Sequence, residues 1–97
     1  MKLRYSARAL QQIDEALGYV AERSPSGAAK IAGRVTAILT LLQSQPHAGG
    51  RTRLSGVRRI ALTPYPYLID YYAGEDEIVV LRFRHAARNP SSIPGRA

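Results

Sequence analysis

The sequence predicts an α+β domain in which a helical hairpin packs on one face of a four-stranded antiparallel sheet. Apolar residues recur at helical spacing through the first half of the chain, and they alternate with polar residues from about residue 57 onward. Short segments rich in turn-forming residues separate these runs. A chain of 97 residues that is 45% apolar can bury one core, so residues 1–97 are expected to form a single domain.

The chain begins with a predicted strand and a predicted helix. Lys2–Tyr5 alternates polar and apolar residues, which is typical of a short strand. Ser6 can cap a helix that begins near Ala7. That helix carries one apolar stripe at three- and four-residue spacing, which includes Leu17 and Val20.

A second helix follows almost at once. The segment at 23–26 ends the first helix, and Ser24 with Pro25 provides a cap and a first helical residue for the next one, which extends to about Gln43. Because the connection is so short, the two helices are expected to form an antiparallel hairpin. A passage through such a hairpin reverses the chain twice. We therefore expect the first strand to run opposite to the last and to pair beside it at the sheet edge.

The second half of the sequence is predicted to form a loop and three strands. A loop rich in Gly and Pro covers residues 44–56, and strands are expected at Val57–Thr63, at Tyr67–Tyr72 and at Glu77–His85. Residues 89–97 are expected to form a loop or a frayed tail. Alternation in the last strand assigns its residues to two faces, with Val79, Leu81 and Phe83 on one and Val80, Arg82 and Arg84 on the other.

Composition excludes several classes of function. The chain has no cysteine, so disulfide scaffolds, zinc fingers and thiol catalysis are excluded, and a reducing cytoplasm is the natural setting. No apolar stretch is long enough to span a bilayer, and the first residues do not resemble a signal peptide. We expect no membrane partner.

Few residues could perform chemistry. The two histidines, His47 and His85, do not have the spacing of a metal site, and the glycines do not form a phosphate-binding loop. The acidic residues occupy a helix face and a turn, where solubility is the expected role. We therefore expect no catalytic residue, no metal and no cofactor.

Charge points to an anionic partner instead. Fourteen basic residues against seven acidic ones give a net charge of +7, and most of the basic residues are Arg. Arg82, Arg84 and Arg59 fall on the non-core face of their strands, where they could bind an anion. The alternative is that they are counter-ions of Asp70, Glu77 and solvent.

Several segments, taken in order, resemble the RelE/ParE toxin superfamily and in particular its ParE branch. They include the proline-capped second helix at Ser24–Lys30, the loop at Pro46–Arg51 and the arginine-bearing strand at Val57–Ile60. The segments Pro66–Tyr71 and Val79–Pro90 are similar to the last two strands of that family and its closing motif, although Asn89 stands where Asp is common.

The resemblance implies a toxin of a type II toxin–antitoxin system that inhibits DNA gyrase without being an enzyme. It also implies neutralisation by a ParD-like antitoxin with an acidic C-terminal segment, in a hetero-oligomer, and no sequence-specific nucleic-acid binding by the toxin. The expected target-binding residues are Arg59, Arg82, Arg84, His85 and Arg88. The expected antitoxin-binding residues are Leu17, Val20, Arg51, Arg53 and Arg58.

Two other functions stay open. A RelE-like ribosome-dependent mRNA endoribonuclease would need a proton acceptor and donor, and His85 is the one plausible imidazole, on the apolar face with Phe83. A small basic nucleic-acid-binding module would explain the charge, but no predicted helix is basic along one face.

Overall fold

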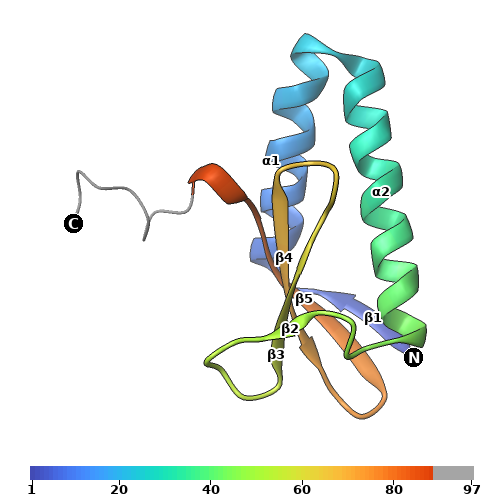
Figure 1. Ribbon diagram of the computed structural model, residues 1–97. Coiled ribbons are helices and arrows are strands. Elements are labelled where there is room, and N and C mark those ends of the chain that lie inside the picture. The colour runs from blue at the N-terminus through green and yellow to red at the C-terminus, as the bar shows by residue number, and fades with distance from the viewer. Residues whose placement is uncertain (89–97) are drawn as a thin grey trace, which may run out of the picture.

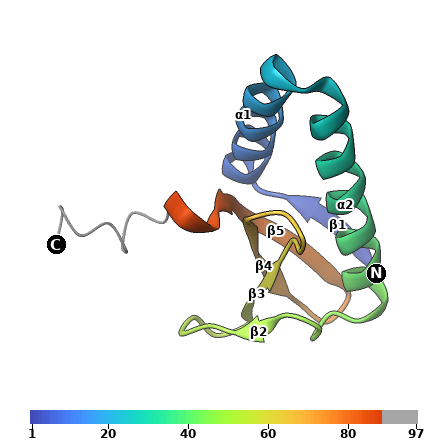
Figure 2. The ribbon, with the colours of Figure 1, turned by 45° about the horizontal axis from the view of Figure 1, so that its top comes forward.

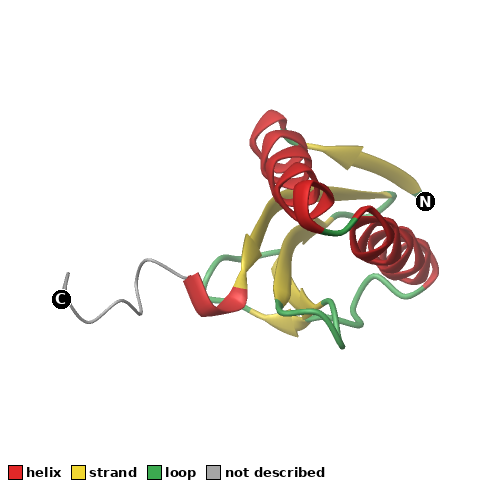
Figure 3. Ribbon diagram, turned by 90° about the horizontal axis from the view of Figure 1, so that it is seen from above, coloured by secondary structure: helices red, strands yellow, loops and turns green. Residues whose placement is uncertain are grey.

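The computed structural model describes residues 1–88, so the predicted tail at 89–97 lies outside the described residues. Two helices cover one face of a sheet, which confirms the predicted α+β fold (Figure 1). Figure 3 shows both helices on the same side of the strands. The elements in chain order are β1 (Lys2–Tyr5), α1 (Ala7–Arg23), α2 (Pro25–Ser44), β2 (Gly50–Arg51), β3 (Val57–Ala61), β4 (Tyr67–Ala73), β5 (Glu77–His85) and the 3₁₀ turn η1 (Ala86–Arg88).

Both helices begin at the predicted caps. The Ser6 hydroxyl accepts a hydrogen bond from the Ala9 amide at 3.0 Å, and the Ser24 hydroxyl accepts one from the Gly27 amide at 3.0 Å. Pro25 occupies the first turn of α2, where its missing N–H costs no hydrogen bond. These local signals fix the helical hairpin, whose turn lies beyond the sheet in Figure 1.

The sheet has five strands in the order β1-β5-β4-β3-β2, so the prediction of four strands was wrong. The additional strand, β2, is two residues long and pairs antiparallel with β3. The sheet is also mixed, because β1 pairs with β5 in parallel and not in the opposite direction as expected. One error explains the other: β2 adds one chain reversal between the helices and β3, which inverts the direction of every later strand relative to β1. The pairing of the first and last strands is confirmed (Figure 2).

A β-bulge interrupts the alternation in β5. Tyr71 of β4 pairs with Val80 and its neighbour Asp70 pairs with Arg82, so Leu81 has no partner on β4. Ile78, Val80 and Phe83 are therefore the buried residues of β5, and the prediction that Val79 and Leu81 share a face with Phe83 was wrong. Ser6 stabilises the bulge, since its hydroxyl donates to the Leu81 carbonyl at 3.0 Å.

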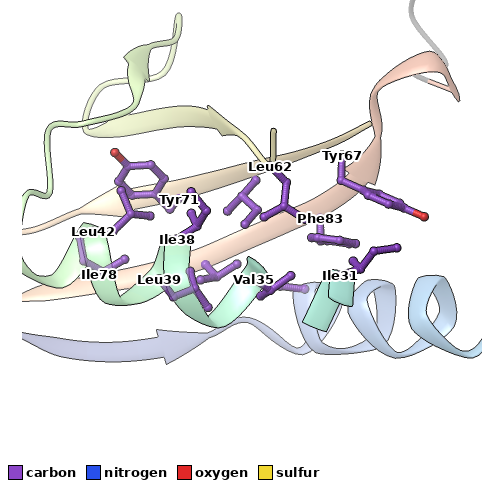
Figure 4. Close-up of a cluster of buried hydrophobic side chains, with 13 residues drawn as sticks. Ile31, Val35, Ile38, Leu39, Leu42, Leu62, Tyr67, Tyr71, Ile78 and Phe83 are labelled. Carbon is purple, nitrogen blue, oxygen red and sulfur yellow. The ribbon is translucent and has the colours of Figure 1, made fainter. Parts of the chain in front are cut away.

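The core lies between the helical hairpin and the sheet. Side chains of α2 meet aromatic and branched residues of β4 and β5, and the rings of Tyr67 and Phe83 stack with their centroids 5.0 Å apart (Figure 4). Within residues 1–88, the other face of the sheet carries no helix. The buried apolar residues are Ala9, Ile31, Val35, Ile38, Leu39, Leu42, Leu62, Tyr67, Ile69, Tyr71, Ile78, Val80 and Phe83.

Within residues 1–88, neither helix is both long and apolar enough to cross a membrane.

Candidate functional site

The uncovered face of the sheet is hollowed and lined with arginine. A cavity of about 960 Å³ lies between the loop that carries β2 and the outer side chains of β3, β4 and β5. We call this surface the arginine face. It is defined by Arg51, Arg53, Arg59, Arg82 and Arg84, with Asp70 among them.

Strand register sets the positions of these side chains. Arg59 of β3 pairs with Asp70 of β4, and Asp70 pairs with Arg82 of β5, so the three residues form one row across the sheet. Arg84 pairs with Leu68 in the next row, on the same face. The bulge at Leu81 directs Arg82 and Arg84 to this face while Val80 stays in the core.

Asp70, the carboxylate of the arginine face, forms an ion pair with Arg59. Arg59 Nε donates to Asp70 Oδ1 at 2.6 Å, and Arg59 Nη2 donates to Oδ2 at 3.2 Å. Asp70 is buried, whereas the Arg59 side chain is 41% exposed. The hydrogen bond to Asp70 is the main cause that raises the pKa of Arg59. Both oxygens of Asp70 are thus engaged by a single guanidinium group.

Two arginines of β5 have buried nitrogen atoms without acceptors in residues 1–88. Arg82 Nε, Arg84 Nε and Arg84 Nη1 are buried and have no hydrogen-bond partner in the part of the chain that the structure describes. Burial lowers the pKa of Arg84, and the positive charges of Arg59 and Arg82 lower it further. A buried donor without a partner costs about 1–3 kcal/mol, so the face as it stands is short of oxygen acceptors.

A buried tyrosine holds the loop that carries β2. The Tyr71 hydroxyl donates to the Pro46 carbonyl at 2.7 Å and accepts from the Gly49 amide at 2.9 Å. Arg58 Nη1 donates to the Gly49 carbonyl at 2.9 Å. A Cβ on Gly49 would lie 2.7 Å from the Tyr71 hydroxyl and 2.8 Å from the Arg59 carbonyl oxygen, so only glycine fits this approach. These contacts position β2, and with it Arg51, beside β3.

The structure brings together part of the predicted target-binding set. Arg59, Arg82 and Arg84 share the arginine face. His85 lies on the core side of β5, as expected: its ring meets Tyr67 edge-on at 5.3 Å, and its Nδ1 accepts a hydrogen bond from the Ala87 amide. Arg88 ends η1, beyond the last strand.

The predicted antitoxin-binding residues do not form one surface. Leu17 and Val20 lie on α1, half-buried against the core. Arg58 is engaged with the Gly49 carbonyl. Arg51 and Arg53 instead join the arginine face. Sequence reasoning separated them from it because β2 was not predicted, although polar and basic residues alternate directly after Gly49-Gly50.

A second hollow lies between α1 and β5. It has a volume of about 520 Å³, and its apolar lining includes Ala16, Tyr67 and Phe83. Arg82 and Arg84 border this groove as well as the arginine face. In residues 1–88, no group of three or more His, Asp or Glu side chains is placed to hold a metal ion.

Comparisons with known proteins agree with this architecture. Residues 3–90 match the family described as the ParE toxin of the type II toxin–antitoxin system parDE. The chain is 32% identical over 81 residues to Toxin RelE2 of Caulobacter vibrioides, covering 84% of this chain and 90% of that one. It is 29% identical over 85 residues to Y4kP of Sinorhizobium fredii, which is named as a presumed toxin, with 88% of each chain covered.

The fold has a counterpart among solved structures. A chain of the structure described as the chromosomal ParDE TA system from P. aeruginosa superposes with a TM-score of 0.74, at 23% identity, over 88% of this chain and 95% of that one. The match to the family covers almost the whole chain, including both helices and all five strands. This protein therefore belongs to the ParE family of toxins of type II toxin–antitoxin systems.

Proposed function

We propose that this toxin inhibits DNA gyrase in the cytoplasm by binding it through the arginine face, and that a ParD-like antitoxin with an acidic segment neutralises it. The observation that carries the proposal is the chemistry of that face. It offers several guanidinium groups and one carboxylate, and the carboxylate is already bound by Arg59 on both oxygens. Such a surface is suited to binding an anion.

The same chemistry favours a binding role over RNA cleavage. Cleavage needs a proton acceptor and a proton donor beside the cations that hold the phosphate. Arginine stays protonated at all physiological pH values, so it cannot act as the proton acceptor. His85 does not line the arginine face but the groove between α1 and β5, with its Nδ1 engaged by the Ala87 amide and its ring against Tyr67.

The groove between α1 and β5 is the proposed seat of the antitoxin segment. Its lining combines the apolar residues Ala16 and Phe83 with Gln12 and Glu15, and Arg82 and Arg84 border it. An amphipathic acidic segment would place apolar anchors in this groove and carboxylates against the arginines. Because the same two arginines belong to the arginine face, a bound antitoxin would also cover part of the target-binding surface. Leu17 and Val20 lie on the same helix but are half-buried against the core and do not line this groove.

The test compares two activities of the purified toxin. Gyrase supercoiling and ribosome-dependent mRNA cleavage are measured with wild-type protein, with Arg84→Gln, with His85→Ala and with Arg8→Gln. Arg8 lies on α1 and is exposed, so its replacement removes the same charge away from the arginine face. We expect inhibition of supercoiling by wild type and Arg8→Gln, strong loss in Arg84→Gln, and no mRNA cleavage. Cleavage that disappears in His85→Ala would assign the protein to the RelE-like alternative.

A further inference from the structure

We propose that the arginine face binds the phosphate groups of a DNA backbone without reading base sequence, so that the toxin contacts gyrase-bound DNA as well as gyrase itself. The proposal rests on the proposed function and names the ligand of the same surface.

Within the described residues, acceptors of the protein itself do not satisfy the guanidinium groups of Arg82 and Arg84. Arg82 Nε, Arg84 Nε and Arg84 Nη1 are buried at the sheet and have no acceptor within residues 1–88. They belong to two side chains in neighbouring rows of the sheet. A carboxylate presents two oxygens in a plane, as Asp70 does to Arg59. A phosphate group presents its oxygens tetrahedrally and can accept from donors that approach from different sides.

The arrangement of charge indicates an extended anion. Arg51, Arg53, Arg82 and Arg84 form no ion pair with a carboxylate among the described residues, whose ion pairs use Arg4, Arg23 and Arg59. The arginines reach from β5 across the sheet to the loop beyond β2. A single small anion cannot meet all of them, whereas a polyanion with regularly spaced charges can.

The lining favours nucleic acid over an acidic protein segment. Five arginine side chains line the cavity, against three large apolar residues, Leu54, Val57 and Leu81. The centres of protein–protein interfaces are depleted in charged residues, whereas protein–DNA interfaces are strongly positive. The arginines project from a sheet and a short loop, with no helix among them to enter a major groove. Contacts of this kind position a protein on the backbone and carry no sequence information.

The test measures binding of a labelled DNA duplex of about 20 base pairs and arbitrary sequence by fluorescence anisotropy, from about 50 to 200 mM salt. Four phosphate contacts predict a slope of log Kobs against log salt of about −3.6, or roughly a 100-fold loss of affinity over this range. Arg82→Gln and Arg84→Gln should each weaken binding about tenfold and reduce the slope by about one. Arg8→Gln serves as the charge-matched control and should leave the slope near the wild-type value.

Two further variants keep the test independent of folding defects. Arg84→Lys retains the charge but not the donor geometry, and it should bind DNA more weakly than wild type with a slope close to wild type. Asp70→Asn removes the competing carboxylate and should tighten DNA binding several-fold. Thermal unfolding by circular dichroism confirms that each variant is folded.

The outcomes separate this inference from the proposed function. DNA binding that is equally weak in wild type and Arg84→Gln overturns the inference, even if the toxin still inhibits gyrase. Binding of a glutamate-rich peptide that depends on Arg82 and Arg84, together with no detectable DNA binding at about 50 mM salt, also overturns it and assigns the face to an acidic protein. DNA binding with the expected variant pattern, but without any effect on gyrase, supports the inference and contradicts the proposed function.

Discussion

Replacing Arg84 by Met is expected to stabilise the fold while it removes toxicity. Arg84 has two buried nitrogen atoms without acceptors, and burial together with Arg59 and Arg82 disfavours its charge. Methionine has a flexible apolar side chain and no hydrogen-bond donor, so it can replace the aliphatic stem of Arg84 without leaving an unmet donor. Residues that serve binding often stabilise the fold less than another residue at the same position would. We expect Arg84 to be such a residue.

The magnitude follows from the unmet donors. Each costs about 1–3 kcal/mol when fully buried, and the low end applies here because the Arg84 side chain is only partly buried. Two donors at about 1 kcal/mol each, less a fraction for altered packing of the aliphatic stem, give a net gain of about 1–2 kcal/mol in the free energy of unfolding. For a domain of this size, that gain corresponds to a rise in Tm of roughly 5–10 °C.

Urea denaturation and thermal unfolding measure the stability, and growth inhibition on expression measures toxicity. Arg51→Met is the matched control, because it removes the same charge from an exposed position on the same face and should change stability by no more than about 0.5 kcal/mol. A loss of stability in Arg84→Met would refute the reasoning, since it would mean that the guanidinium group is well solvated in the folded protein.

Three further predictions concern the buried tyrosine and its loop. Tyr71→Phe should lower the free energy of unfolding by about 1–3 kcal/mol in urea denaturation, because the Gly49 amide and the Pro46 carbonyl lose their shared partner. Because burial raises the pKa of Tyr71 above its ordinary value of 10.0, the folded protein keeps this proton at pH values where the unfolded chain releases it. The contribution of Tyr71 to stability, measured by urea denaturation, should therefore be constant below about pH 10 and fall above it, so Tyr71→Phe should show a smaller fall in this range. Gly49→Ala should cost more than Tyr71→Phe in the same assay, since the added methyl group meets the Arg59 carbonyl as well as the tyrosine hydroxyl; an unchanged midpoint would show that the loop can move away.

Local sequence signals predicted the helices better than the sheet. Ser6 and Ser24 act only on amides a few residues away, so the caps could be recognised from the sequence alone. The two-residue strand β2 has no comparable local signal, because its stability comes from pairing with Arg58 and Arg59, which follow later in the chain. Missing it also changed the count of chain reversals, and this is why the predicted direction of β1 was wrong.

The candidate site was predictable only in part for a similar reason. Alternation placed Arg82 and Arg84 on one face and Arg59 on the non-core face of its own strand, and the register of the sheet confirms that they meet. The sequence also suggested Asp70 as a counter-ion, but it could not indicate that one arginine would take both oxygens. Side-chain packing decides which arginines have no acceptor, and the periodicity of the sequence carries no information about that packing.

The bulge at Leu81 affects which changes in the length of β5 can be accepted during evolution. Loss of one residue within a strand normally exchanges its inner and outer faces beyond that point, which destroys the core. Leu81 is the surplus residue between two correctly paired halves of β5, so its deletion would leave Phe83 inside and Arg82 and Arg84 outside. A length change is thus tolerable where the half of β5 that carries Arg82 and Arg84 joins the half that carries Ile78 and Val80. During evolution, the orientation of Arg82 and Arg84 can therefore change while the packing of the core residues of β5 is retained.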